Sequence, residues 1–161
     1  MKVICFHNPD EENGYLSNWA LSEFTVNGIP FSSMEQYMMY QKAVYFKDKE
    51  IAGKILATTD VAVIKALGRQ VKGYNDGYWN GVRQLLVYEG LKEKFVQNED
   101  LKKQLLDTED SILAECAVND RIWGIGLSMQ DSNRLEPEKW RGQNLLGYAL
   151  MVVRERMQGL F

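Results

Sequence analysis

Short apolar runs near the N-terminus predict β-strands. Val3–Phe6 is the first of these runs. Phe24–Val26 and Ile29–Phe31 flank the dipeptide Asn27-Gly28, and Asn-Gly between two apolar runs is the strongest short-range signal of a β-hairpin. The first part of the chain therefore predicts one strand followed by one hairpin.

Beyond residue 31 the apolar positions recur every three to four residues, which is the spacing of an amphipathic helix. This spacing predicts helices over residues 32–46, 48–57, 60–67, 78–97, 99–106 and 144–157. In the longest of them, the predicted core face consists of Trp79, Val82, Leu85, Leu86, Leu91 and Phe95.

Two segments between the predicted helices have other patterns. Residues 111–118 are apolar and β-branched enough for a strand, and a short helix is nearly as compatible with them. Residues 124–142 are mostly polar and predict a long loop. No repeat or linker-like stretch interrupts the sequence. The pattern predicts an α+β fold, a predominantly helical single domain over residues 1–161 with a small β-sheet.

Composition and charge narrow the classes of protein. The 161 residues are 45% hydrophobic and 25% charged, which is ordinary for a globular domain. Nineteen basic against 22 acidic residues give a net charge of −3, so we do not expect the broad basic surface that grips long nucleic acid. The N-terminal sequence does not resemble a signal peptide, and no apolar run is long enough to cross a bilayer. The expected compartment is the cytoplasm, with no membrane partner.

Cysteine and histidine usage limits the possible chemistry. Cys5 and Cys116 are too few for a disulfide framework and lie in apolar runs, so we expect buried free thiols. His7 is the single histidine, which excludes a zinc site with two or more histidine ligands. Acid–base chemistry must therefore rely mainly on Asp, Glu, Lys, Tyr or bound water.

The first candidate site lies in the predicted helix that starts near residue 32. Glu35 and Lys42 are seven residues apart and so share nearly the same helix face, with Tyr37 and Gln41 flanking it. A carboxylate and an amine in one pocket can shift each other's pKa for proton transfer or nucleophilic attack. Ser32-x-x-Glu35 also fits a capping box, in which Glu35 only bonds the backbone at the helix start. The spacing alone favours this capping role.

The second candidate site follows residues 111–118. Asp120 comes just after the apolar run, and Trp123 and Gly124 place an aromatic ring beside a bare backbone. This arrangement suits a flat ring stacked on Trp123, with Asp120 accepting a ring N–H or acting as a base. Since Asn and Asp are common turn residues, a purely structural turn is an equally good explanation.

Weaker signals lie elsewhere in the chain. Arg141 precedes the last predicted helix, whose N-terminus suits a phosphate, although Asn144 at this position is also a typical N-cap. Four further candidates are polar or basic side chains in turns or at helix ends: Ser17, Asn18, Arg69 and Lys72. The last candidate is Trp79, an aromatic residue whose position is more typical of a core.

Taken in order, these motifs resemble those of the NADAR (NAD- and ADP-ribose-associated, YbiA-like) family. Each motif is unspecific by itself, but six in the same order are specific, and the resemblance runs from about Ile4 to Arg154. The matching elements are Leu16-Ser17-Asn18-Trp19, Ser33-x-Glu35-x-Tyr37 with Gln41-Lys42-Ala43, Leu67-Gly68-Arg69, Trp79, Asp120-x-x-Trp123-Gly124-x-Gly126 and Gly142-x-Asn144-x-Leu146-Gly147.

The resemblance implies an N-glycosidase, a hydrolase that cleaves the bond between C1′ of a ribose phosphate or ADP-ribose and the amine of a heterocycle. Members of the family act on early riboflavin-pathway intermediates or remove ADP-ribose from guanine in nucleic acid. The implied partner is therefore a ribosyl or ADP-ribosyl substrate, either free or carried on DNA or RNA. No metal or organic cofactor is implied.

The resemblance also implies roles for the candidate residues. Because the transition state carries positive charge at C1′ and the leaving nitrogen needs a proton, we expect Glu35 and Asp120 to divide these tasks. Lys42 either attacks C1′ of a ring-opened sugar or holds Glu35 ionised. We expect Trp79 and Trp123 at the base and Arg69, Lys72 and Arg141 near phosphate, within a set of substrate-binding residues that comprises Ser17, Asn18, Tyr37, Arg69, Lys72, Trp79, Trp123, Gly124, Arg141 and Asn144.

Two other classes compete with the enzyme. A non-catalytic module that binds ADP-ribose or a nucleotide would need the pocket but no acid, so the presence of both Glu35 and Asp120 argues against it. A scaffold protein would bury Trp79 and Trp123 in its core and would have no affinity for phosphates.

Overall fold

The computed structural model describes residues 1–159. The chain divides into two compact units: Met1–Ala20 together with the chain from Glu99 onward forms the first, and Leu21–Asn98 forms the second. Six α-helices and two two-stranded sheets lie within the described residues, so the predicted α+β class with mostly helical content is confirmed. One domain over residues 1–161 stays a prediction, and residues 160–161 lie outside the described part.

The first unit contains a parallel pair of strands. β1 (Val3–Phe6) pairs with β4 (Ile112–Glu115), and the register places Phe6 opposite Glu115. Residues 111–118 thus supply a strand rather than a helix, because β1 offers the hydrogen-bonding partner that a single strand lacks.

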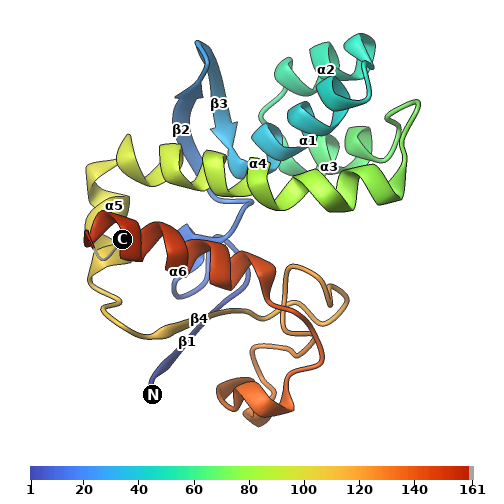
Figure 1. The fold of residues 1–161 in the computed structure, drawn as a ribbon. Helices are drawn as coiled ribbons and strands as arrows, with labels where there is room; N and C mark the ends of the chain where they lie inside the picture. Colours follow the sequence, from blue (N-terminus) through green and yellow to red (C-terminus); the bar gives the residue numbers. More distant parts are fainter. Residues whose placement is uncertain (160–161) are drawn as a thin grey trace. The chain divides into compact units, whose positions relative to one another are not determined.

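Two helices and three short turns complete the first unit. α6 (Leu145–Met157) packs on β4, and α5 (Glu99–Leu106) contacts α6 (Figure 1). The short turns are single turns of 3₁₀ helix. The first, η1 (Gly14–Leu16), follows β1, whereas η2 (Ser132–Leu135) and η3 (Pro137–Lys139) lie in the segment 124–142 that was predicted as a loop.

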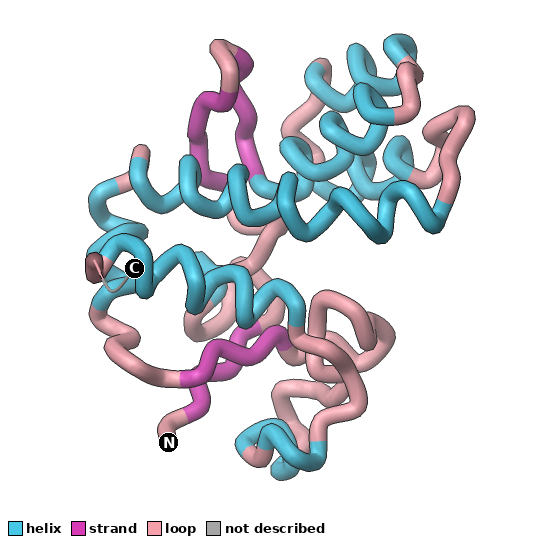
Figure 2. The backbone as a smooth tube through the Cα atoms, in the orientation of Figure 1, coloured by secondary structure: helices cyan, strands magenta, loops and turns pink. Residues whose placement is uncertain are grey.

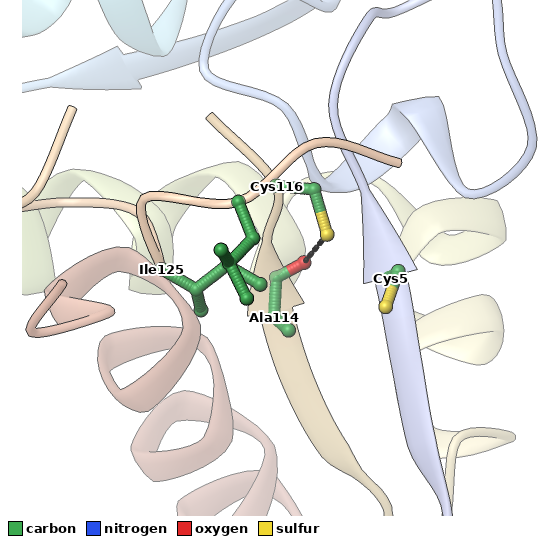
Figure 3. Close-up of a cluster of buried hydrophobic side chains, with 5 residues drawn as sticks. Cys5, Ala114, Cys116 and Ile125 are labelled. Atoms are coloured by element: carbon green, nitrogen blue, oxygen red, sulfur yellow. Dashed lines mark hydrogen bonds between the residues drawn. The ribbon is translucent and has the colours of Figure 1, made fainter. Parts of the chain in front are cut away.

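A buried apolar cluster packs against the β1–β4 pair (Figure 3). The Cys116 thiol donates a long hydrogen bond to the Ala114 carbonyl, at 3.8 Å. Both cysteines are buried free thiols, as predicted. The members of the cluster are Cys5, Ala114, Cys116, Ile125 and Leu127.

The second unit opens with the predicted hairpin. β2 (Leu21–Val26) pairs antiparallel with β3 (Ile29–Ser33) (Figure 2). Asn27 and Gly28 both have positive φ, 50° and 80°, as a tight hairpin turn of type I′ requires. The Asn-Gly signal in the sequence therefore located this turn correctly.

Four helices follow the hairpin and agree with the predicted segments to within two residues: α1 (Met34–Tyr45), α2 (Lys49–Leu56), α3 (Val61–Gly68) and α4 (Asp76–Val96). Each begins after a residue whose side-chain oxygen accepts a backbone N–H of the first turn, and these N-cap residues are Ser33, Asp48, Asp60 and Asn75. None of the helices in residues 1–159 combines the length and apolar character that crossing a membrane requires.

The core face of α4 differs in part from the prediction. Trp79, Leu91 and Phe95 are buried as expected, but Leu85 is 70% exposed. The buried stripe instead includes Lys94, whose side chain is fully enclosed. Gly90 also lies on this stripe, where a β-carbon would overlap with the ring of Tyr37 from α1. The predicted core position of Leu85 is therefore wrong, because helix α4 turns its Gly90 face toward α1.

Candidate functional site

The start of α1 shows that Glu35 does not cap this helix. The Ser33 hydroxyl accepts the backbone N–H of Gln36, and the Gln36 side-chain oxygen accepts the backbone N–H of Ser32. The amide of Gln36 also donates to the carbonyl of Ile55. The capping interactions thus involve Ser33 and Gln36, and the favoured capping role of Glu35 is wrong. Glu35 itself is 5% exposed.

Lys42 lies on the same face of α1 as Glu35. Its ammonium donates a 2.7 Å hydrogen bond to the carbonyl of Gly68 at the end of α3 and sits 4.5 Å from the centre of the Tyr74 ring. Burial lowers the pKa of Lys42, and the positive charge of Arg69 lowers it further, while Glu35 opposes the shift. The second unit therefore holds a partly desolvated amine beside a buried carboxylate, which was the less favoured of the two interpretations of this spacing.

The other candidates of the second unit differ in exposure, since Arg69 and Lys72 are exposed and Trp79 is buried. Arg69 caps the C-terminal end of α3 and is exposed, so its guanidinium remains accessible near Lys42. Lys72 is exposed as well, and its backbone N–H donates to Asp48. Trp79 is 5% exposed and packs at 6.4 Å from the ring of Phe46. Trp79 thus belongs to the core of this unit, as its position in the sequence favoured.

Tyr37 and Gln41 do not flank the Glu35–Lys42 face. Tyr37 comes two residues after Glu35, about 200° further round the helix. Its ring packs edge-on against Phe31 at 5.3 Å, on the side of α1 that meets the hairpin. Tyr37 and Gln41 instead line a separate cavity of about 440 Å³. The expectation that they border the Glu35–Lys42 pair is therefore corrected.

In the first unit, one oxygen of Asp120 belongs to a turn. Its Oδ1 accepts the backbone N–H groups of Ile122 at 3.0 Å and Trp123 at 2.8 Å. Gly124 is buried, and a β-carbon there would lie 2.9 Å from the carbonyl oxygens of Asp120 and Glu115. The turn considered for Asp120 is thus present, and the glycine is required for a close approach of backbone segments. Trp123 is half-buried.

The sequence alone did not indicate a second, largely buried carboxylate next to this turn, that of Glu115. Glu115 ends β4, and its Oε1 lies 3.5 Å from Nδ1 of His7. Burial raises the pKa of Glu115 and the charge of Asp120 raises it further, while His7 opposes the shift. Among the described residues, no hydrogen bond reaches the buried Oε2 of Glu115. The strand register sets Phe6 opposite Glu115 and so brings the next residue, His7, close to Glu115. Only this register could have predicted the His7–Glu115 pair.

Three further candidates lie in the first unit, and they differ in burial and in hydrogen bonding: Ser17, Asn18 and Arg141. The Ser17 hydroxyl accepts the backbone N–H of Trp19, so it forms a turn. The side-chain oxygen of Asn18 is buried and accepts no hydrogen bond from any described residue, which leaves it available to a ligand. Arg141 is exposed, and its backbone N–H donates to Ile125.

Asn144 has a structural role within the fold. It is fully buried, its Oδ1 accepts the backbone N–H of Glu115, and its Nδ2 donates to the carbonyl of Leu113. A β-carbon at Gly147, one turn later, would overlap with the same carbonyl. The Asn144 side chain makes no cap bond to α6, because both ends of its amide bond the backbone of β4 and so attach α6 to this strand. Both polar atoms of the Asn144 side chain are thus used within the fold, and a substrate contact by Asn144 stays a prediction.

The candidate residues fall into two groups. Glu35, Lys42 and Arg69 come together in the second unit, and Glu115, His7 and Asp120 come together in the first. The second unit also contains Tyr37, Lys72 and Trp79, and the first contains Ser17, Asn18, Trp123, Gly124, Arg141 and Asn144.

Comparison with known proteins places this chain in a family. The family model described as NADAR domain matches residues 5–158, nearly the whole chain. This chain belongs to the NADAR family. The resemblance drawn from the ordered motifs is thereby confirmed.

Several curated relatives of this chain carry names that state a biochemical role. An N-glycosidase of Acanthamoeba polyphaga mimivirus is 38% identical over 165 residues, which span 98% of this chain and 97% of the relative. A riboflavin biosynthesis protein of Vibrio vulnificus is 34% identical over 96% of this chain, and the match covers 38% of that longer protein. The N-glycosidase YbiA of Escherichia coli is 28% identical, with 96% of this chain and 88% of the relative covered.

The fold agrees with that of a solved structure. The NMR structure of the Escherichia coli protein YbiA matches 99% of this chain and 86% of its own, with a TM-score of 0.81 and 28% sequence identity. The predicted fold class is therefore supported by an experimentally determined relative as well as by the elements of this chain.

Proposed function

We propose that this NADAR protein is an N-glycosidase that hydrolyses the bond between C1′ of a ribosyl group and the amine of a heterocycle. The observation that carries the proposal is the amine of Lys42, partly desolvated and within electrostatic reach of Glu35, on the helix that contains the family motif. The name of the mimiviral relative, which shares 38% of its residues over nearly the whole chain, supports the same reaction class.

Glu35 would stabilise the positive charge that develops at C1′. A buried carboxylate acts strongly on such a charge because little water screens it. The leaving nitrogen requires a proton, and Asp120 is proposed as a residue that takes part in this acid–base work. Its Oδ1 is committed to the turn, so any such role falls to the second oxygen. Glu115, whose pKa is raised by burial, is a further carboxyl group in the same unit.

Lys42 is proposed as a nucleophile rather than as a charge partner alone. Burial lowers its pKa, which increases the fraction of neutral amine able to attack carbon. Nζ would bond to C1′ of the ring-opened sugar while the C1′–N bond to the heterocycle breaks and the released amine takes a proton. Water would then hydrolyse the lysine imine, releasing the sugar and regenerating Lys42.

The proposed substrate is a ribosyl phosphate or ADP-ribosyl group on an aminated ring. Two sources fit this chemistry: a riboflavin-biosynthesis intermediate and ADP-ribosylated guanine in DNA or RNA. The exposed Arg69, Lys72 and Arg141 are the cations proposed to meet phosphate groups. The net charge of −3 favours a few discrete contacts with one modified base over a long nucleic-acid interface.

Product analysis with two substrates tests this proposal. Wild type, Glu35→Gln and the control Glu50→Gln would be incubated with guanine-ADP-ribosylated DNA and with the ribosylamino-pyrimidine phosphate of riboflavin biosynthesis. Glu50 is a suitable control because it is an exposed acid in α2 that pairs with Lys54 on the same helix. We expect wild type and Glu50→Gln to release a sugar product from one substrate and Glu35→Gln to release little.

Two outcomes contradict the proposal. Full turnover by a folded Glu35→Gln variant would remove Glu35 from the chemistry. Absence of cleavage of both substrates, together with a thermal shift on adding ADP-ribose, would identify a non-catalytic ADP-ribose-binding module instead.

A further inference from the structure

The cavity on the other side of α1 has no role in the proposed reaction. It lies within the second unit, between the hairpin, α1 and α4, and measures about 440 Å³, which is in the size range of small-molecule sites. Its lining residues are Thr25, Val26, Asn27, Tyr37, Gln41, Leu86, Glu89 and Glu93.

The lining carries two negative charges and no positive one. Glu89 and Glu93 are four residues apart on α4, so both carboxylates occupy the same helix face. Lys92, outside the lining, is 3.7 Å from a Glu89 oxygen and 4.0 Å from a Glu93 oxygen, which leaves the pair only partly compensated. The other Glu93 oxygen accepts a 2.7 Å hydrogen bond from Gln97. The carboxylates are thus held at the cavity by surface partners.

Tyr37 supplies a second, independent indication of a ligand. Its side chain is 1% exposed and lines the cavity, yet no described residue makes a hydrogen bond to its hydroxyl. A hydroxyl group at the wall of a cavity can both donate and accept a hydrogen bond with a ligand. Burial and the charges of Glu89 and Glu93 raise the pKa of Tyr37 to about 12, so the hydroxyl is protonated at neutral pH.

We propose that this cavity binds a small organic cation, an amine or guanidinium compound. The two carboxylates select positive charge, the phenol oxygen of Tyr37 and the amide oxygen of Gln41 accept further N–H groups, and Val26 and Leu86 offer apolar surface to an alkyl chain. A bare metal ion fits less well, since no group of three His, Cys, Asp or Glu side chains within residues 1–159 is placed to hold one.

This site is distinct from the Glu35–Lys42 pair. Tyr37 and Gln41 lie on the face of α1 toward the hairpin and α4, whereas Lys42 bonds Gly68 at the end of α3. One helix therefore presents a cationic amine on one side and borders an acidic cavity on the other. Because binding to the cavity can be measured without any turnover, its failure would leave the proposed N-glycosidase activity untouched.

Calorimetric titration of the full chain with agmatine tests the inference. Agmatine carries both an amine and a guanidinium group, N-butylurea serves as the neutral probe and glutarate as the anionic one. We expect saturable binding of agmatine that weakens as salt is added, and no binding of the other two.

Four variants locate the binding. Glu93→Gln keeps an oxygen for Gln97 and should weaken agmatine binding about tenfold, and the more exposed Glu89→Gln about threefold. Tyr37→Phe keeps the ring packing and should cost about threefold through the lost hydroxyl. Glu50→Gln in α2 makes the same change of charge away from the cavity and should bind agmatine as wild type does.

Several results would overturn the inference. They are the absence of saturable agmatine binding to wild type, equal binding of N-butylurea, and an equal loss of affinity in Glu50→Gln and Glu93→Gln. Thermal unfolding of each variant provides the folding control.

Discussion

The two units of this protein use the polar residues of their motifs in opposite ways. In the first unit, Asp120 and Asn144 look like ligand-binding residues, but their side chains bond the backbone of a turn and of β4. In the second unit, Glu35 looked like a helix cap, but Ser33 and Gln36 form the cap. Both side-chain ends of Asn144 are thus used by the structure, Asp120 keeps one carboxylate oxygen outside its turn, and Glu35 is released because a neighbour forms the cap.

The comparison predicts which substitutions change activity and which change stability. Residues that bond the backbone should act mainly on the free energy of unfolding. Residues whose structural task is performed by a neighbour should act mainly on turnover.

The largest effect is expected at Lys42. Lys42→Arg keeps the positive charge near Glu35 but cannot form an imine, so we expect turnover to fall at least about 10³-fold. Stopped-time product analysis measures the loss, and reduction with borohydride during turnover should trap a sugar adduct on wild type only. Activity of Lys42→Arg within tenfold of wild type would show that Lys42 acts through its charge.

The next effect is on stability, at Asn144. Asn144→Gly tolerates the left-handed backbone at φ 53° but removes both bonds to β4, so the free energy of unfolding should fall by about 3 kcal/mol. Urea denaturation measures this change. Asn27→Gly makes the same substitution at an exposed position with φ 50° and should change stability by less than about 0.5 kcal/mol. Equal effects in the two variants would contradict the role of Asn144 in attaching α6.

Asp120 is expected to contribute both to the stability of its turn and to turnover. One variant separates these two contributions. Asp120→Asn retains an oxygen that accepts the N–H groups of Ile122 and Trp123, so the turn and the melting temperature should be unchanged. Turnover should nevertheless fall about 100-fold, because the charge and the proton of the carboxyl group are lost. Unchanged turnover would assign Asp120 to the turn alone.

The smallest effect is a pH dependence at His7. The carboxylate of Glu115 raises the pKa of His7 above its ordinary value of about 6.5. The pair therefore stabilises the fold fully below pH 6.5, and this stabilisation is lost as pH rises through the raised pKa. Since the His7 side chain is 41% exposed, we expect only a few tenths of a kcal/mol.

Urea denaturation at pH 6 and pH 8 checks this pH dependence. Wild type should lose slightly more stability than His7→Gln between the two values. A His7 pKa at or below 6.5 in an NMR titration would contradict the interaction with Glu115.

Local features of the sequence predicted most of the elements. The hairpin follows from Asn27-Gly28, and the helices follow from apolar spacing, because turn geometry and helix faces depend on residues a few positions apart. The spacing of Glu35 and Lys42 likewise placed the amine and the carboxylate near each other, and the ordered motifs identified the family.

What the local pattern could not decide depends on contacts between distant residues. The pairing of His7 with Glu115 and the bonds of Asn144 to β4 join segments that are far apart in the chain. The exposure of Leu85 depends on which face of α4 meets a neighbouring helix. The same holds for the acidic cavity, because Tyr37 meets Glu89 and Glu93 only when α1 packs on α4. Spacing within one element defines its faces, and tertiary packing decides what each face contacts.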